Sequence, residues 1–195
     1  MSRIRYKKVL AVITLLLGAF SLQGVHPAQA DPHRTSIQPL RIFGVGSVLL
    51  GTGSILVRTK EGVGMTLHTF GLVPGNVYTA WWIFFNNPKA CTGGCGGDDF
   101  DNPDVQAVAL WGSGQIAGAD GTADFGAFRA VGDLTGLEPG NGTVGLVKPF
   151  KAEIHIVVRS HGPAIPALLS QQLSKFDGGC PPNTCLNVQF AIHKP

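Results

Sequence analysis

Residues 151–163 read KAEIHIVVRSHGP, and this stretch decides the fold. Successive side chains of a strand point to opposite faces, so Ile154, Ile156 and Val158 share one face of an extended chain. We expect a strand over residues 152–160 whose isoleucines face the core and whose other face, which is polar, meets solvent. That polar face carries Glu153, His155, Arg159 and, if the strand continues, His161.

The N-terminus has the pattern of an export signal. Four basic residues lie among the first eight, an apolar run covers residues 9–20, and Ala28-Gln29-Ala30 has the small-x-small form of a cleavage site. The run is shorter than the roughly 20 residues that span a bilayer. We therefore expect a cleaved signal at 1–30 and a secreted or periplasmic domain at 31–195 that does not span a membrane. Two prolines make residues 31–39 a loose lead-in.

The export signal also carries the apparent positive charge of the chain. The whole sequence has 15 Lys and Arg against 12 Asp and Glu, and four of the basic residues lie in the signal. The remainder has 11 against 12, a net charge of −1 with neutral histidines. This balance excludes an electrostatic basis for binding nucleic acid or acidic membranes.

The rest of the chain is patterned as short strands separated by Gly-, Pro- and Asn-rich turns. The one convincing helix covers residues 164–176, where apolar side chains recur at helical spacing. About eight strands and one helix predict an all-β fold, an antiparallel β-sandwich or jelly-roll-like domain. The clearest other strand segments are 54–59, 64–70, 77–85, 105–111, 122–128 and 186–193.

Four cysteines remain for an exported protein, in which disulfides are the default. They are Cys91, Cys95, Cys180 and Cys185, and three pairings are open. We favour the local pairs Cys91–Cys95 and Cys180–Cys185, because both lie in Gly- or Pro-rich loops. A four-cysteine zinc site is the alternative, although its CxxxC and CxxxxC spacings lie at or beyond the edge of the usual ligand pattern.

Glu153 and His155 are the best candidates for chemistry. Two residues apart on one strand face, they emerge about 6.6 Å from each other, so the carboxylate can orient the imidazole or a metal ion can bridge the two side chains. His161 lies roughly 20 Å further along an extended strand. A divalent metal would therefore need a third ligand from another strand, and the candidate metal ligands are His68, His155, His161 and His193.

Three interpretations of the polar face stay open. It is the solvated side of a sheet, a divalent-metal site, or a metal-free polar ligand pocket. Arg159 favours the first, because a cation disfavours a neighbouring metal ion. No other cofactor is indicated.

Two further segments have competing interpretations. The acidic loop 98–104 offers oxygen ligands of the kind calcium prefers, but its spacing is not that of an EF-hand, and an exposed loop held by cysteines is the simpler reading. The aromatic residues are either core or an exposed platform for a ligand or partner, and core packing is the commoner use. They are Trp81, Trp82, Phe84, Phe85 and Trp111.

Five spaced motifs support a resemblance. They are GLVPGNVYTAWWIFFNNP (71–88), FDNPDV (100–105), GADGTADF (118–125), EIHIVVRSHGPAIP (153–166) and FDGGCPPNTC (176–185). With its RSHGPAIP and GGCPPNTC motifs, the chain resembles a family of secreted bacterial β-rich proteins with no assigned function. The resemblance implies an exported β-rich domain and no reaction. The IH…HGP segment is also faintly similar to CHRD domains and to copper–zinc superoxide dismutase-like sandwiches, but it lacks their His-x-His ligand pair, so no ligand carries over.

The sequence thus predicts a binding or structural module for an unidentified ligand or protein, which uses the polar face of strand 152–160. The alternative is a metal-dependent or His/Glu acid–base enzyme around His155 and His161. An enzyme requires a concave pocket in which His155 and His161 meet at least one of His68, His193 or Arg159. Assembly through an exposed aromatic patch is a third option.

Overall fold

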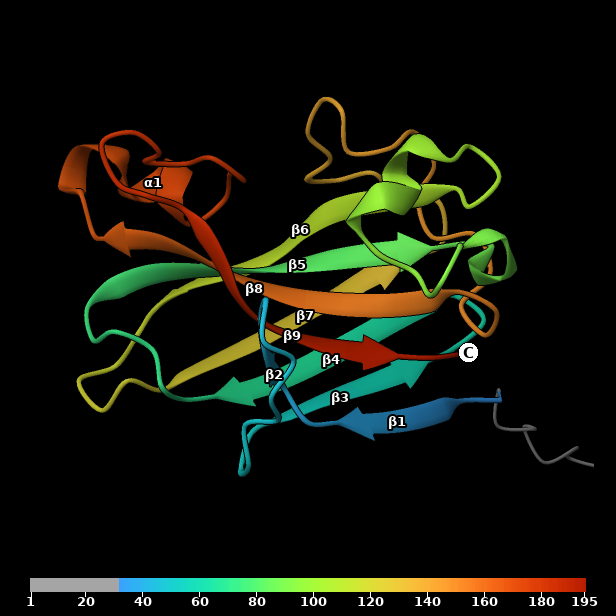
Figure 1. The fold of residues 1–195 in the computed structure, drawn as a ribbon, viewed down its shortest axis with the longest axis horizontal. Helices are drawn as coiled ribbons and strands as arrows, with labels where there is room; N and C mark the ends of the chain where they lie inside the picture. The colour runs from blue at the N-terminus through green and yellow to red at the C-terminus, as the bar shows by residue number, and fades with distance from the viewer. Residues whose placement is uncertain (1–31) are drawn as a thin grey trace, which may run out of the picture. The chain divides into compact units, whose positions relative to one another are not determined.

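The KAEIHIVVRSHGP segment forms β8 (Glu153–Pro163), the middle strand of a five-stranded antiparallel sheet. The computed structural model describes residues 32–195, so the export signal predicted at 1–30 lies outside it. Strand β8 pairs with β5 on one side and with β9 on the other (Figure 1). In spatial order the sheet contains β2 (Arg41–Ile42), β9 (Leu186–His193), β8, β5 (Asn76–Phe85) and β6 (Ala107–Ile116).

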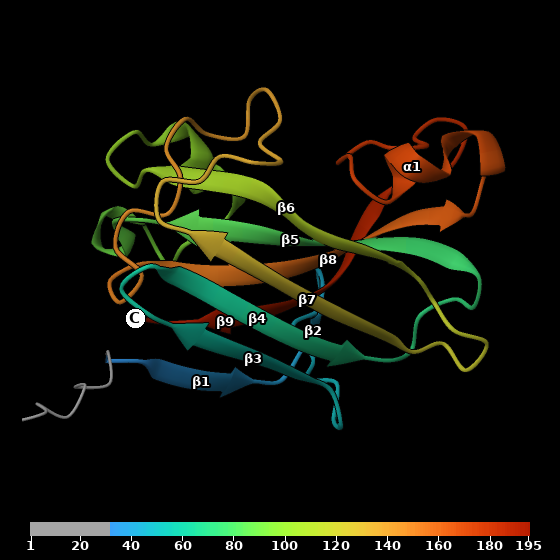
Figure 2. The same ribbon diagram turned by 180° about the vertical axis from the view of Figure 1, so that it is seen from behind.

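A four-stranded antiparallel sheet packs against the first (Figure 2). In spatial order it contains β1 (Arg34–Gln38), β3 (Gly53–Arg58), β4 (Gly62–Thr69) and β7 (Ala123–Ala130). The loose lead-in predicted for 31–39 is wrong, because β1 pairs with β3 over five residues. It is an edge strand with mostly exposed side chains, so backbone hydrogen bonds hold it and the polar sequence gives little sign of it.

The core lies between the two sheets. Ile154, Ile156 and Val158 are fully buried there with Trp82 and Phe84 from β5. The facing sheet contributes its own buried side chains, among them Leu56, Met65 and Leu67. Burial of one such side chain stabilises the fold by about 1.5–3 kcal/mol. The predicted all-β sandwich is confirmed, and so is the inward direction of the isoleucines.

Two irregular segments cover the outer face of the five-stranded sheet, and Figure 1 shows them at opposite ends of it. The loop after β5 contains the 3-10 turns η1 (Pro88–Ala90) and η2 (Gly97–Asp101). The segment after β8 contains η3 (Pro166–Leu168) and the single helical turn α1 (Leu169–Gln172). Residues 32–195 contain no helix that is long and apolar enough to cross a membrane.

Each covering segment carries one disulfide. Cys91 pairs with Cys95 and Cys180 with Cys185, with Cα–Cα distances of 5.1 and 5.9 Å. The local pairing is therefore confirmed. The two pairs lie in different segments, and the four cysteines form no common metal-binding group in the described part of the chain.

The helix after β8 is shorter than the predicted 164–176. The carbonyl of Leu173 accepts a hydrogen bond of 2.9 Å from Trp111 Nε1. The same residue packs directly on Gly114, where a Cβ atom would lie 2.2 Å from the Leu173 carbonyl oxygen. Tertiary contacts with β6 thus replace helical continuation, and the apolar spacing reflects packing on the sheet.

Candidate functional site: a pocket on the outer sheet face

The polar face of β8 is buried, so the predicted solvated face is wrong. The exposed fractions of Glu153, His155, Arg159 and His161 are 7, 8, 9 and 0%. These side chains do point away from the isoleucines, as the alternation predicts. The two covering segments lie over them and remove them from solvent, which a local pattern does not reveal.

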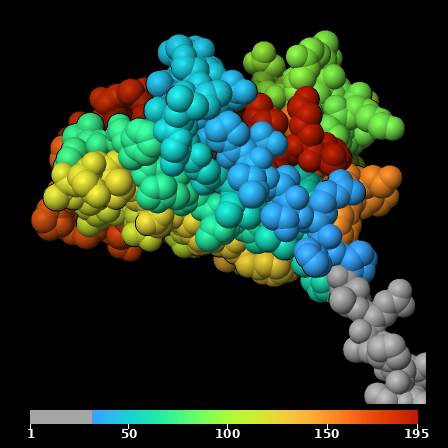
Figure 3. All heavy atoms as spheres, turned by 90° about the horizontal axis from the view of Figure 1, so that it is seen from below, coloured from blue at the N-terminus to red at the C-terminus, as the bar shows by residue number. Residues whose placement is uncertain are grey.

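Between the covering segments the outer face retains a pocket of about 470 Å³. Its floor comes from β5, β6, β8 and β9, and its walls come from the chain after β2, the covering segments, the loop after β7 and the start of β9. In the space-filling view of Figure 3, red C-terminal atoms lie between blue-to-cyan N-terminal atoms and the green loop after β5. The floor residues are Trp81, Ile83, Phe85, Ala109, His155, Val157, Phe190 and Ile192, and the walls include Phe43, Phe100, Asn141, Phe176 and Asn187.

His155 is the titratable side chain of this pocket. Its Nε2 lies 2.8 Å from Glu153 Oε1, and its ring meets Phe85 edge-on with centroids 4.9 Å apart. Burial lowers the His155 pKa below its usual value, and the Glu153 carboxylate opposes this shift only in part. The neutral imidazole donates its Nε2–H to Glu153, so Nδ1 is left as a hydrogen-bond acceptor. We find no partner for Nδ1 among the described residues.

Arg159 fixes one wall of the pocket rather than lining it. Its guanidinium lies 3.8 Å from the ring centroid of Phe176, and its Nε donates to the Phe176 carbonyl at 2.8 Å. It also donates to Asp177 at 2.9 Å and to Asn187 at 3.1 Å. Burial lowers the pKa of Arg159 and Asp177 opposes the shift, and the group stays charged. Arg159 is therefore a positioning residue for Phe176.

His161 lies at the other end of β8 in a hydrogen-bonded chain. Trp81 Nε1 donates to Thr79 Oγ1 at 2.7 Å, and Thr79 Oγ1 lies 2.8 Å from His161 Nε2. His161 Nδ1 lies 2.9 Å from the carbonyl oxygen of Gly178. Burial is the largest cause of the lowered His161 pKa. The neutral ring satisfies every bond with Nδ1–H donating to Gly178 and Thr79 donating to Nε2.

The two remaining candidate histidines lie elsewhere. His68 is on the four-stranded sheet, exposed, and bonded to Asp124 at 2.7 Å. His193 lies between the sheets, 2.7 Å from Ser36 Oγ and 2.9 Å from Ser54 Oγ. Burial, with Arg58 nearby as the second cause, lowers the His193 pKa to about 4. Across residues 32–195 the four imidazoles form no shared metal-binding group, so the predicted metal set is not assembled.

The secondary candidates have structural roles. The Asp99 carboxylate accepts a 2.7 Å hydrogen bond from the backbone of Gly96 at the start of η2, and the acidic loop forms no metal-binding group in the region that the structure covers. The β5 aromatics divide between its two faces: Trp82 and Phe84 pack in the core between the sheets, as predicted, whereas Trp81 and Phe85 are buried on the outer face and line the pocket.

Sequence reasoning missed the pocket walls. Phe100 and Phe176 come from irregular segments, and Phe43 follows the two-residue strand β2. No periodic signal marks such residues, because loop folding brings them together over the sheet. Phe190 and Ile192 do alternate along β9, which places them on one face without showing that a pocket lies above it.

Comparisons with protein-family models, with curated proteins and with solved structures find no match for this chain. The resemblance to secreted bacterial β-rich proteins stays a prediction. The geometry of the site is therefore the basis for a functional proposal.

Proposed function

We propose that this chain is a binding module that works outside the cytosol and takes a small, largely apolar ligand into the pocket on the outer face of the five-stranded sheet. The ligand carries one hydrogen-bond donor, such as a hydroxyl or an amine N–H, and His155 Nδ1 accepts it. The observation that supports this most directly is the buried His155 imidazole, which Glu153 holds so that Nδ1 is left as an unpartnered acceptor, in a pocket lined by aromatic side chains.

The pocket has the character of a small-molecule site. Its volume lies within the 300–1,000 Å³ range of ligand sites, and such sites are mostly apolar with a few placed polar groups. Five phenylalanines and one tryptophan line it. Aromatic walls favour a flat or ring-containing ligand, because rings stack or meet edge-on at little entropic cost. The export pattern of the N-terminus and the two disulfides support the location.

The enzyme alternative has weaker support. An acid–base function would use the His155–Glu153 pair, whose 2.8 Å contact has the right geometry. The further groups that an enzyme would need, however, do not meet His155. Among the described residues, His68, Arg159, His161 and His193 do not line this pocket.

A probe pair tests the binding proposal. 2-Naphthol has an aromatic body and one O–H donor, whereas 2-methoxynaphthalene has the body without the donor. Chemical-shift perturbation by 2-naphthol should map to the amides around the pocket, and 2-naphthol should bind about tenfold more tightly than the ether, as one hydrogen bond of about 1.4 kcal/mol implies.

Substitution His155→Phe removes the acceptor and keeps a ring, so it should abolish the preference for 2-naphthol. His68→Phe is the matched control, because His68 is exposed on the other sheet, and it should leave the preference unchanged. Shift changes away from the pocket, or an equal preference in the His155 variant and the unmodified protein, would refute the proposal.

A further inference from the structure

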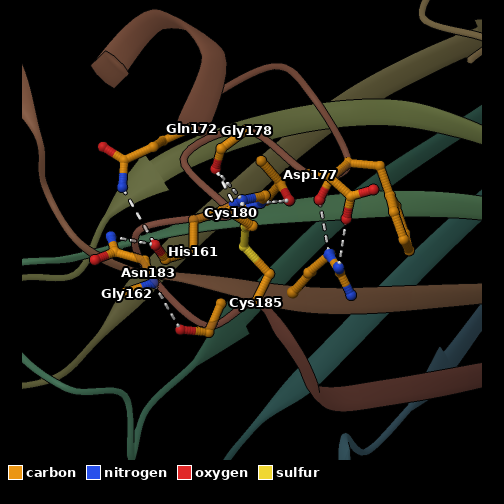
Figure 4. The surroundings of a disulfide bond; sticks show 12 residues. His161, Gly162, Gln172, Asp177, Gly178, Cys180, Asn183 and Cys185 are labelled. Atoms are coloured by element: carbon orange, nitrogen blue, oxygen red, sulfur yellow. Dashed lines mark hydrogen bonds and ion pairs between the residues drawn. A yellow bond between two sulfur atoms is a disulfide. The ribbon is translucent and has the colours of Figure 1, made fainter. Parts of the chain in front are cut away.

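A second group of side chains lies at the far end of β8 and is separate from the pocket. His161, Cys180 and Cys185 present one nitrogen and two sulfur atoms that lie within 4.8 Å of one another. His161 Nδ1 is 3.6 Å from Cys185 Sγ. Figure 4 shows the imidazole beside the Cys180–Cys185 disulfide. It is the sole group of three or more potential metal ligands in residues 32–195.

The loop that holds these cysteines is tied to β8 by hydrogen bonds that do not involve the disulfide. Asn183 Nδ2 donates to the carbonyls of His161 and Pro163 at 2.7 and 2.8 Å. Gln172, which is fully buried, donates to the same two carbonyls at 3.2 and 2.9 Å. Gly162 brings the chains into contact with a φ of +72°, and a Cβ atom there would lie 2.9 Å from Asn183. The loop therefore has anchors that survive cleavage of the S–S bond.

The imidazole is oriented as metal-bound histidines are. The ring nitrogen that does not bind the metal is normally held by a hydrogen bond from the protein, which fixes the direction of the other nitrogen. In His161, Thr79 holds Nε2 at 2.8 Å, while Nδ1 lies on the cysteine side. His161 is fully buried, and both cysteines are partly exposed, so a reductant and an ion can reach the sulfurs.

We propose that reduction of the Cys180–Cys185 disulfide creates a site for one Cu(I) ion, bound by both thiolates and by His161 Nδ1. Thiolates are soft ligands that favour Cu(I), whereas Zn(II) in structural sites takes four ligands and this group supplies three. In the disulfide form the site is closed to the ion, and His161 Nδ1–H donates to the Gly178 carbonyl.

The chemistry balances with a dithiol as reductant. The dithiol gives two electrons and two protons to the protein S–S bond and becomes a disulfide, and the protein gains two thiols. Cu(I) then forms two Cu–S bonds and one bond to His161 Nδ1, and the two thiol protons go to solvent. The His161 proton leaves Nδ1 and one returns at Nε2, so the imidazole stays neutral and its tautomer changes.

Cys91 and Cys95 provide a matched control pair. They form the same kind of local disulfide, with a Cα–Cα distance of 5.1 Å, but belong to no group of three potential ligands among the described residues. The proposal thus requires that only the C-terminal pair binds copper with high affinity.

The experiment is a competition titration of Cu(I) against bathocuproine disulfonate, with purified protein reduced by dithiothreitol and desalted without oxygen. We expect one Cu(I) per chain for the reduced Cys91→Ser/Cys95→Ser variant, and no stoichiometric binding for Cys180→Ser/Cys185→Ser or for the oxidised protein. The reverse pattern would overturn the proposal. So would loss of the native circular dichroism on reduction, or tighter one-to-one binding of Zn(II) than of Cu(I).

Two readouts test His161 itself. Long-range ¹H–¹⁵N spectra should show the His161 proton on Nδ1 in the oxidised protein and on Nε2 in the Cu(I) form. Substitution Thr79→Val removes the bond to Nε2 and should weaken Cu(I) binding about tenfold, as loss of a group that orients a ligand does. An unchanged tautomer, or unchanged affinity in the Thr79 variant, would remove His161 from the site.

Discussion

The two faces of β8 are both largely buried, but by different means. On the inner face, Ile156 packs between the two sheets with its apolar neighbours and is fully buried. On the outer face, the polar side chains have exposed fractions of 9% or less, yet each has a specific partner. Glu153 bonds His155, Arg159 bonds Asp177, and the other end of the strand is tied to the covering loop.

The difference shows what each kind of burial requires. Apolar burial is non-directional, so many sequences with the same alternation give the same inner face. Buried polar groups cost free energy unless they are hydrogen-bonded, so the outer face needs specific hydrogen-bond partners from distant parts of the chain. We therefore expect substitutions on the inner face to change global stability most, and those on the outer face to act on the covering segments and the pocket.

The largest effect should come from the inner face. Ile156→Ala leaves a cavity between the sheets, so the free energy of unfolding should fall by about 3 kcal/mol. Val157→Ala is the adjacent control on the pocket floor, and it should cost about 1 kcal/mol or less, because Val157 is not fully buried and the pocket beside it is already open. Urea unfolding followed by tryptophan fluorescence measures both. Equal losses would contradict the contrast between the faces.

The next effect concerns His193, one of the polar side chains that lie between the sheets. Burial lowers the His193 pKa to about 4, below the value of about 6.5 expected for the unfolded chain. Below pH 6.5 the unfolded chain therefore binds more protons than the folded chain, and stability falls as the pH drops toward 4. The loss between pH 7 and pH 5 should be about 2 kcal/mol.

Chemical unfolding at several pH values measures this loss. His193→Gln should remove about 2 kcal/mol of the difference between pH 7 and pH 5, while His68→Gln, on the exposed face of the other sheet, should leave it unchanged. The lowered pKa values of His155 and His161 act in the same direction, so a smaller slope should remain. An undiminished slope in His193→Gln would show that His193 is not the group responsible.

Local pattern predicted the strand framework well. The alternation of 152–160 and the apolar run 77–85 gave β8 and β5, and the segments predicted at 54–59 and 64–70 are the paired strands β3 and β4. Cysteine spacing within loops predicted both disulfides. These features depend on neighbours in sequence, where periodicity and turn chemistry are informative.

The site depended on contacts between distant segments. Nothing near Glu153 in sequence shows that Phe100 and Phe176 stand over the sheet, so a polar face with the pattern of a solvated surface turned out to be covered. Likewise, the polar edge strand at Arg34–Gln38 is held by its backbone, and the short helix ends because Leu173 bonds to β6. The approach of His161 to the C-terminal cysteines follows from the same loop folding.

The smallest effect on global stability should come from the outer face and should appear first in the covering segment. Arg159→Met keeps an apolar stem over Phe176 and removes the charged hydrogen bonds, so residues 164–180 should open at lower free energy, by about 1.5 kcal/mol, in native-state hydrogen exchange. Because Phe176 forms a pocket wall, 2-naphthol binding should weaken in the same variant.

Asp177→Ala is the control, since the Asp177 side chain is 72% exposed and an exposed ion pair contributes less than about 1 kcal/mol. If Asp177→Ala loosens the segment as much as Arg159→Met does, the exposed ion pair holds the Phe176 wall in place. If Asp177→Ala has little effect, the wall is held by the hydrogen bond from Arg159 to the Phe176 carbonyl and by the stacking of the guanidinium on the Phe176 ring.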